Sequence, residues 1–330
     1  MDKHIESIIL NHTKASGIGK QEIIQSLWSG YGKIIRYYLE NSQYKSIVAK
    51  HIKLPNTSQH PRGWNTDLSH QRKLKSYAIE MTFYRNWSAS CKTFCYVPEC
   101  IHIEDMNHES LILLEDLNDV GFPIRKTSVN LHDMKLCLKW LAHFHACFMG
   151  RNPEGLWQTG TYWHLDTRPD ELGALSDLPL KNAAALIDET LNKCKYKTFV
   201  HGDAKLANFC FSEDEKRVAA VDFQYIGGGC GMKDVAYFMG SCMYEDDCEK
   251  HEKALLDYYF DELYNALNVY GKAINYNELE FEWRQLYPIA WTDFHRFIKG
   301  WSPGHWKIHS YSERLSRAVI QQLKSPKRYQ

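Results

Sequence analysis

The chain has 330 residues, 44% of them hydrophobic and 24% charged, and is long enough to bury the core of one large or two medium-sized domains. Its 40 lysine and arginine residues balance 40 aspartate and glutamate residues, so bulk affinity for nucleic acid is not expected. No window approaches about 18 apolar residues, and the first residues lack the apolar core of a signal peptide. We therefore expect a cytoplasmic protein that does not span a membrane.

The first part of the chain has the pattern of a small sheet-rich lobe. A glycine-containing turn is expected at residues 29–32 and another turn at residues 105–108. The polar, proline-containing segment 55–65 is expected to be mobile, and apolar residues at helical spacing predict a helix over residues 66–87. Five stretches predict the strands of one sheet: residues 23–28, 33–40, 46–52, 94–103 and 110–114.

An acidic break at residues 115–119 separates this part from a mainly helical remainder. It divides the chain into an expected nucleotide-covering N-terminal lobe, residues 1–117, and an expected catalytic C-terminal lobe, residues 118–330. The second lobe begins with a helix over residues 131–149, and a glycine cluster at residues 227–231 leads into further helices. The expected fold class is therefore α+β: a five-stranded antiparallel sheet with a helix, followed by a mainly helical lobe.

The most informative segment is H-G-D-A-K-L-A-N at residues 201–208, followed by V-D-F-Q at residues 221–224. Asp203 stands five residues before Asn208, and Asp222 follows the next apolar stretch. Phosphoryl transfer from ATP needs one carboxylate that accepts the proton of the attacking hydroxyl, and an amide and a second carboxylate that hold magnesium. The spacing matches the protein-kinase catalytic loop, H-R-D-x-x-x-x-N, with D-F-Q in place of D-F-G. The motif therefore predicts a kinase.

Glycine stands at the arginine position of that loop, and the H-G-D form resembles the aminoglycoside phosphotransferase and choline kinase group. The closest resemblance is to its ecdysteroid-kinase-like branch, and it implies a bilobal, protein-kinase-like fold that uses ATP and Mg²⁺. It also implies that Asp203 is the catalytic base and that Lys205 contacts the γ-phosphate. Asn208 and Asp222 are the implied magnesium ligands.

Two further residues have implied structural roles in the same loop. His201 is expected to brace the loop by hydrogen bonds. Asp234, which follows the glycine cluster, resembles the aspartate that anchors the backbone of the loop in this group; a plain helix N-cap is the alternative.

The remaining parts of a kinase site occur in the expected order before the catalytic loop. Lys50 ends the run I-V-A-K, close to the V-A-I-K pattern of the lysine that meets the α- and β-phosphates. Glu80 lies in the predicted helix, where it can pair with that lysine. Gly30 and Gly32 form a weaker signal for a turn that covers the phosphates. The hinge that follows the sheet is expected to hydrogen-bond adenine, at Glu115 and Leu117.

The acceptor is the least determined part of the prediction. No A-P-E segment is present, and eleven residues separate Asp222 from Asp234, so a protein-kinase activation loop does not fit and a small-molecule alcohol is favoured. Aminoglycosides, choline-like amines, sugars and steroid alcohols all stay open. Six tryptophans of the second lobe suit an aromatic acceptor wall or plain packing: Trp157, Trp163, Trp283, Trp291, Trp301 and Trp306.

Two other functions are compatible with the same motifs. A protein-kinase-like enzyme is the enzymatic alternative, and a nucleotide-binding pseudokinase or regulatory module is the other. Neither nucleic acid, nor a membrane, nor an obligate protein partner is indicated by the sequence.

Overall fold

The structure is a computed structural model and describes residues 3–27, 30–53, 67–91, 94–106 and 109–325. The segment 55–65, predicted to be mobile, lies outside the described residues, as do residues 28 and 29 and residues 107 and 108 of the predicted strand and turns. None of the helices that the structure describes is long and apolar enough to cross a membrane.

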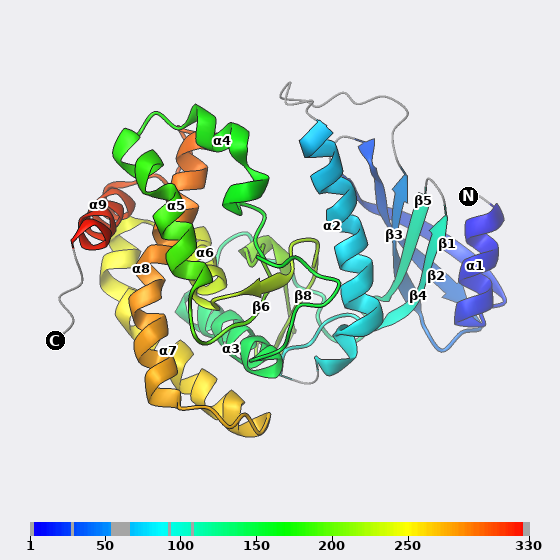
Figure 1. Ribbon diagram of the computed structural model, residues 1–330. Helices are drawn as coiled ribbons and strands as arrows, with labels where there is room; N and C mark the ends of the chain where they lie inside the picture. The colour runs from blue at the N-terminus through cyan, green and yellow to red at the C-terminus, as the bar shows by residue number, and fades with distance from the viewer. Residues whose placement is uncertain (1–2, 28–29, 54–66, 92–93, 107–108, 326–330) are drawn as a thin grey trace. The chain divides into compact units, whose positions relative to one another are not determined.

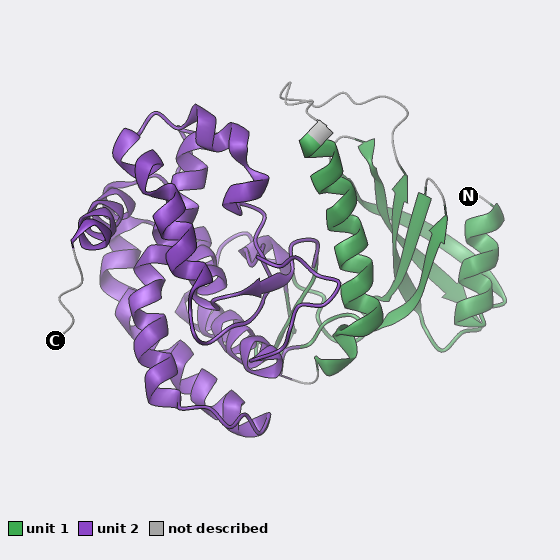
Figure 2. Cartoon of the chain, in the orientation of Figure 1, with its two compact units in different colours: residues 1–92, 96–124, 210–221 green, residues 93–95, 125–209, 222–330 purple. Residues whose placement is uncertain are grey.

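The chain forms two compact units that are not continuous in sequence (Figure 2). Unit 1 comprises residues 1–92, 96–124 and 210–221. Unit 2 comprises residues 93–95, 125–209 and 222–330. The chain therefore returns to unit 1 for twelve residues directly after the catalytic loop. The predicted division into functional lobes at residues 117 and 118 stays a prediction.

Unit 1 is built on one five-stranded antiparallel sheet in the order β1-β2-β3-β5-β4, which confirms the predicted sheet (Figure 1). The helices α1 (Lys3–Thr13) and α2 (Asp67–Asn86) lie on opposite faces of this sheet (Figure 1). Helix α1 was not predicted, whereas α2 matches its predicted range closely. The strands are β1 (Gly17–Ser26), β2 (Gly32–Glu40), β3 (Ser46–Lys53), β4 (Cys100–Met106) and β5 (Glu109–Glu115).

The alternation of side chains along β3 explains how one strand serves both faces. Successive residues of a strand point to opposite sides of the sheet. Ile47 and Ala49 pack in the core cluster beneath α1, together with Ile9 of that helix. Lys50, the next residue, points to the other face, where it meets Glu80 of α2. The β3 sequence thus places a charged side chain on the α2 face while it completes the α1 core.

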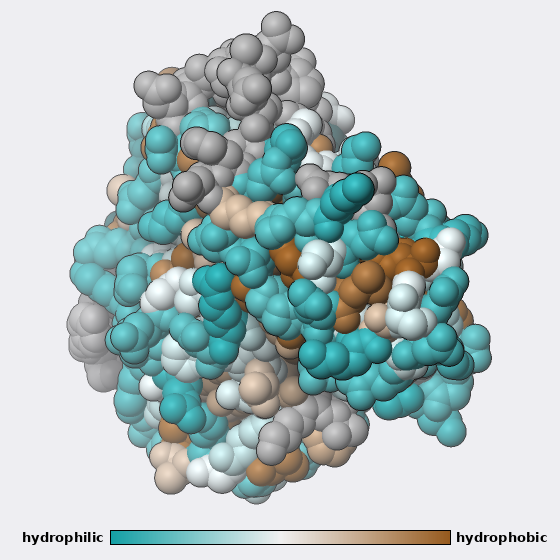
Figure 3. All heavy atoms as spheres, turned by 90° about the vertical axis from the view of Figure 1, so that its right-hand side faces the viewer, coloured by the Kyte–Doolittle hydropathy of each residue, from teal (hydrophilic) through white to brown (hydrophobic). Residues whose placement is uncertain are grey.

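The two outer strands differ most from their predicted positions. Strand β1 begins at Gly17, six residues before the predicted start at residue 23, and most of it is exposed at the edge of the sheet. Its exposed residues include Ile23 and Ile24, on a unit whose visible face is mostly hydrophilic (Figure 3). Strand β4 begins at Cys100 and not at residue 94. An exposed edge strand carries little hydrophobic alternation, so its limits are poorly marked in the sequence.

Unit 2 is mainly helical, as predicted. Its first long helix, α3, begins with a capping box in which Asn130 and Asp133 satisfy each other's backbone N–H groups. The helices are α3 (Leu131–Phe148), α4 (Pro169–Ala174), α5 (Leu178–Asn192), α6 (Met232–Cys242), α7 (Glu245–Val269), α8 (Tyr276–Trp301) and α9 (Ser310–Lys324).

Short strands hold the loop that carries the catalytic motif. Strand β6 (Thr198–Val200) pairs with β9 (Gly227–Gly229) and runs directly into His201. The first three glycines of the cluster at residues 227–231 are therefore a strand, which the sequence did not predict. A second two-stranded sheet pairs β7 (Phe209–Phe211) with β8 (Val218–Ala220). The motif residues thus follow strand ends, where their backbone positions are fixed.

Candidate active site

The backbone of the loop after β6 is held by one buried carboxylate. Asp234, in the first turn of α6, is fully buried and accepts hydrogen bonds from the backbone N–H groups of His201 (2.6 Å) and Gly202 (2.9 Å). Its Oδ2 also lies 3.1 Å from Nε2 of His145, whose other ring nitrogen lies 2.8 Å from the Tyr259 hydroxyl. The anchoring contact implied by the resemblance is therefore present.

Gly202 has a packing reason to be glycine. Its φ of 79° lies in the left-handed region, and a Cβ atom there would come within 2.1 Å of the carbonyl oxygen of Tyr225. No larger residue fits without displacing backbone. The arginine of the protein-kinase motif therefore has no room in this loop.

His201 braces the loop as expected. Its side chain is fully buried, and its Nδ1 accepts a hydrogen bond from the backbone N–H of Asp203 at 3.3 Å. The imidazole packs against Phe223, with the ring centroids 4.7 Å apart. These contacts link the predicted base to the D-F-Q segment through the core of unit 2.

Three side chains contact the Asp203 carboxylate. Lys205 Nζ lies 2.8 Å from Oδ2, and Asn208 Nδ2 donates to the same oxygen at 3.2 Å and to the Asp203 carbonyl at 2.8 Å. Tyr237, from α6, donates its hydroxyl to Oδ1 at 3.1 Å. Burial would lower the pKa of Lys205, but the adjacent Asp203 charge raises it overall, so this ammonium stays protonated. The structure thus brings Asp203, Lys205 and Asn208 together as one hydrogen-bonded group.

Tyr237 was not identified from the sequence. Burial, followed by the charges of Tyr162 and Asp203, raises its pKa well above the ordinary value, so the phenol is a neutral hydrogen-bond donor. It lies 34 residues beyond Asp203 in no motif, and only the packing of α6 beside the loop reveals it.

Asp222 has an unusual backbone for a residue other than glycine. It lies two residues beyond the end of β8, its φ is 70°, and its Oδ1 accepts a hydrogen bond from the side-chain amide of Gln224 at 2.8 Å. Left-handed backbone at such a residue costs of the order of 1–3 kcal/mol and is often found at functional sites. Gln224 is the residue that replaces the glycine of D-F-G, and its amide orients the aspartate.

The donor atoms of Asn208 and Asp222 fit magnesium. Both bonds that Asn208 makes to Asp203 use Nδ2, so the amide oxygen is the atom that Asn208 can offer to a metal. Asp222 contributes carboxylate oxygens, and magnesium prefers oxygen ligands, with few from protein and several from water. Among the residues that the structure describes, no group of three His, Cys, Asp or Glu side chains could hold a metal ion. A magnesium site here therefore depends on these two residues, and their role stays a prediction.

In unit 1 the predicted lysine–glutamate pair is present. Lys50 Nζ lies 2.6 Å from Glu80 Oε2, and both side chains are almost fully buried. The ammonium also lies 5.8 Å from the centre of the Tyr77 ring. Gly30 lies in the turn before β2, and Gly32, on the other side of Tyr31, is the first residue of that strand. The pair fixes the position of the Lys50 charge, which a solvated lysine would not have.

The predicted adenine-binding segment follows β5 without a break. Glu115 is the last residue of the strand, and its side chain accepts a hydrogen bond from Tyr96 at 2.7 Å. The Asp116 carboxylate is buried, and its Oδ2 lies 2.5 Å from Nε of Arg36 in β2. This ion pair holds the segment to the sheet. In the described part of the chain, the backbone N–H of Leu117 donates no hydrogen bond, whereas its carbonyl accepts one from Phe122. Leu117 therefore retains a donor of the kind that a purine ring nitrogen requires.

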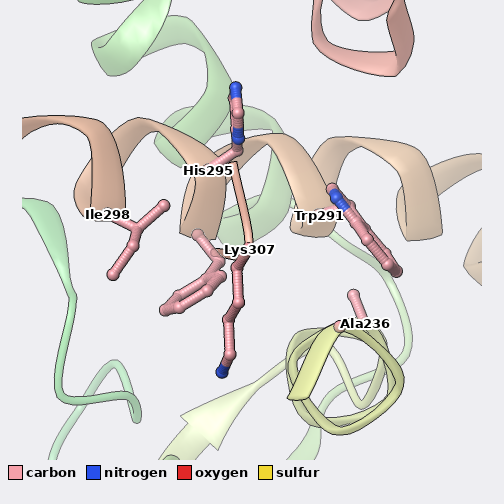
Figure 4. Close-up of a pocket in the computed structure, with 7 residues that line it drawn as sticks. Ala236, Trp291, His295, Ile298 and Lys307 are labelled. Carbon is pink, nitrogen blue, oxygen red and sulfur yellow. The ribbon is translucent and has the colours of Figure 1, made fainter. Parts of the chain in front are cut away.

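A small pocket in unit 2 lies close to Tyr237. Its walls come from α6 and α8, and Lys307 extends across it (Figure 4). All its lining residues follow Lys233, as predicted for the acceptor side, but Asp203 is not among them: Ala236, Gly240, Trp291, Phe294, His295, Ile298 and Lys307. Of the six tryptophans considered, Trp163 and Trp283 are fully buried, whereas Trp306 is 44% exposed. Most of them are thus packing residues, and Trp306 remains available at the surface.

Comparison with known proteins gives the family. A sequence model of the ecdysteroid kinase-like family matches residues 68–155 and 161–272, well over half of the chain. The chain belongs to the ecdysteroid kinase-like family. The matched ranges contain Glu80 and the whole segment from Asp203 to Asp234, whereas Lys50 and Lys307 lie outside them. Membership confirms the predicted resemblance and indicates a kinase-like phosphotransferase that acts on small molecules.

Solved structures similar to this ecdysteroid kinase-like protein have low sequence identity to it. An aminoglycoside phosphotransferase from Streptomyces rimosus, in complex with ADP and streptomycin, is 14% identical over 88% of this chain and 100% of its own, with a TM-score of 0.48. An ethanolamine kinase from Plasmodium vivax is 12% identical over 92% of this chain and 84% of its own, with a TM-score of 0.49. No curated protein matches the sequence. The assignment therefore depends on the family model.

Proposed function

We propose that this protein transfers the γ-phosphate of ATP to a hydroxyl group of a small molecule, with Asp203 as the base. The observation that carries the proposal is the hydrogen-bonded group at Asp203. One carboxylate is positioned by Tyr237 and Asn208 and lies beside the ammonium of Lys205. An aspartate with a purely structural role would not need a partly exposed lysine, such as Lys205, beside its carboxylate. Phosphoryl transfer needs both a proton acceptor and a positive charge at this point.

The chemistry assigned to these residues is a single displacement. The acceptor oxygen forms a bond to the γ-phosphorus, the bond from that phosphorus to the β–γ bridging oxygen breaks, and ADP leaves. The acceptor proton passes to Asp203 late in the transfer, and Lys205 stabilises charge on the transferred group. Magnesium, when bound, neutralises phosphate charge, and Asn208 and Asp222 are the residues that hold it.

Unit 1 supplies the groups proposed to bind the nucleotide. Lys50, held by Glu80, contacts the α- and β-phosphates. The N–H of Leu117, which donates to no described residue, and the backbone of Glu115 hydrogen-bond the adenine. The turn at Gly30 and Gly32 covers the phosphates. An aminoglycoside, a choline-like amine, a sugar or a steroid alcohol is the acceptor. A cytoplasmic location and the lack of nucleic-acid, membrane or obligate protein partners stay predictions from the sequence.

The test is an ATP-turnover screen against a panel of aminoglycosides, choline analogues, sugars and hydroxysteroids. Asp203→Asn is expected to reduce turnover roughly 10²–10⁴-fold at near wild-type Mg-ATP affinity, because it removes proton acceptance and keeps the shape. Asp222→Ala is expected to abolish metal-dependent nucleotide binding, and Lys50→Ala to weaken ATP use. The exposed Asp246→Asn is the matched control and should behave as wild type.

Three outcomes would count against the proposal. Phosphorylation of generic proteins with no turnover of any small alcohol would favour the protein-kinase alternative. Nucleotide binding without turnover of any acceptor would favour the regulatory alternative. Wild-type turnover by Asp203→Asn would show that this residue is not the base.

A further inference from the structure

Lys307 carries an ammonium group that pairs with no carboxylate among the described residues. It lies between α8 and α9, and no described residue accepts a hydrogen bond from its ammonium or forms an ion pair with it. Its surroundings are aromatic instead. The ammonium lies 4.8 Å from the centre of the Tyr237 ring, 5.2 Å from the centre of the Phe294 ring and 5.7 Å from the centre of the Trp306 ring. An ammonium needs hydrogen-bond acceptors, and ring faces satisfy this need only in part.

The position of Lys307 connects it to the base. Tyr237 contacts both groups, with its hydroxyl on Asp203 and its ring face toward Lys307. Burial lowers the pKa of Lys307 to about 8, against the opposing effects of Cys242 and Asp203 and with a contribution from Lys205. Asp203 is already paired with Lys205 at 2.8 Å. Lys307 thus shares Tyr237 with the base, and its own charge is not paired with a carboxylate of any described residue.

The aromatic surroundings continue from Lys307 to the surface. Trp306 is 44% exposed, and its ring centroid lies 5.0 Å from that of Tyr244, which is 66% exposed. On the inner side, Lys307 crosses the pocket lined by Trp291 and Ile298 of α8 and by Ala236 of α6 (Figure 4). Exposed aromatic pairs beside a lysine are a surface that an organic molecule with apolar faces can contact.

We propose that Lys307 determines which acceptors this protein uses: it donates a hydrogen bond to an oxygen of a neutral or anionic alcohol, and it disfavours alcohols that carry a cationic amine. The inference depends on the function proposed above and narrows its acceptor class. Of the acceptors left open, it retains sugars and other oxygen-rich alcohols with apolar faces. It disfavours aminoglycosides and choline-like amines.

Electrostatics and hydrogen bonding point to the same class. An oxygen atom of the substrate alcohol can accept a hydrogen bond from the Lys307 ammonium, which no described residue does. A charged amine on the substrate cannot, because it has only hydrogen-bond donors. A ligand cation also meets a like charge within a partly desolvated site. The aromatic faces that attract a cation elsewhere are already occupied by Lys307. Lys307 lies outside the ranges matched by the family model.

The experiment uses the full-length protein and pairs of alcohols that are identical except that one carries an amino group where the other carries a hydroxyl. Wild type is expected to prefer the hydroxyl member by about tenfold or more in kcat/KM. Lys307→Met should remove most of this preference through KM, with kcat largely kept, whereas Lys307→Arg should retain it. Lys250→Met, at an exposed position of α7, is the control and should match wild type. An unchanged ratio in Lys307→Met would overturn the inference while leaving the proposed function intact.

A second readout does not depend on phosphate transfer. Acetylation of the Lys307 amino group by an amine-reactive ester at pH 8 can be followed by peptide mass spectrometry. The hydroxyl members are expected to slow this reaction several-fold, and the amine members are not. Equal protection by both members, or by neither, would contradict the inference even if the wild type phosphorylated none of them.

Discussion

Replacing Asp234 with asparagine tests whether one carboxylate holds the catalytic loop. The carboxylate is fully buried and accepts hydrogen bonds from the N–H groups of His201 and Gly202. Asparagine keeps one oxygen, and its NH₂ group faces a second donor that it cannot satisfy. Hydrogen bonds to charged groups contribute about 1.5–3 kcal/mol each, and an unsatisfied buried donor costs about 1–3 kcal/mol. We therefore expect the free energy of unfolding to fall by roughly 2–4 kcal/mol.

Urea unfolding and thermal melts measure this change. A loss of that size lowers the Tm by roughly 4–16 °C, at about 2–4 °C per kcal/mol for a unit of this size. Amide exchange of residues 201–205 should accelerate, because the loop loses its buried acceptor. Asp246→Asn removes an exposed carboxylate and is expected to stay within about 0.5 kcal/mol of wild type. A loss below about 1 kcal/mol for Asp234→Asn, with unchanged exchange, would refute the anchoring role.

Two further predictions concern Lys50 and Lys307. Glu80→Gln should destabilise the protein by about 1–3 kcal/mol in urea unfolding, because the Lys50 ammonium loses its charged partner at 2.6 Å inside unit 1; a stability equal to wild type would contradict this. Lys307→Met should stabilise the protein at pH 7 by at most about 3 kcal/mol, because the pKa of Lys307 is about 8 in the folded state and near 10.5 in the unfolded chain. Between pH 8 and 10.5 the Lys307 amine is protonated in the unfolded chain but neutral in the folded protein. The wild type therefore gains stability as the pH rises through this range, and the difference in free energy of unfolding between the two proteins shrinks. A difference that is constant over this range would show that Lys307 is not perturbed.

Elements with buried, periodic residues could be predicted from the sequence. The interior strands β2 and β3 and the helices α2 and α3 carry apolar residues at strand or helical spacing, and their observed limits lie within two residues of those predicted. The spacing of Ile5, Ile8 and Ile9 suits helix α1, but three apolar residues in a short polar segment are a weak signal. Strand β1, exposed along most of its length, had almost none.

The residues of the candidate site also fall into those that the sequence predicts and those that only the structure reveals. Asp203, Asn208 and Asp222 could be found because the chemistry requires fixed spacing along one loop, and Lys50 and Glu80 because strand and helix order is shared by kinases. Tyr237 and Lys307 contact the base or one another through tertiary packing, and no sequence spacing encodes that. Residues of this kind can be identified only from the folded chain.

The glycine strand β9 has a consequence for where motion occurs in this protein. A cluster of glycines is usually taken as a point of flexibility, yet here a Cβ atom on Gly227 would come within 2.2 Å of the Trp157 carbonyl oxygen. The backbone of residues 157–160 hydrogen-bonds one side of the strand, and β6 pairs with the other. The small residues are therefore present so that three backbone segments can lie in direct contact. The richest glycine segment of the chain is a rigid support for the catalytic loop, and a search for moving parts should begin elsewhere.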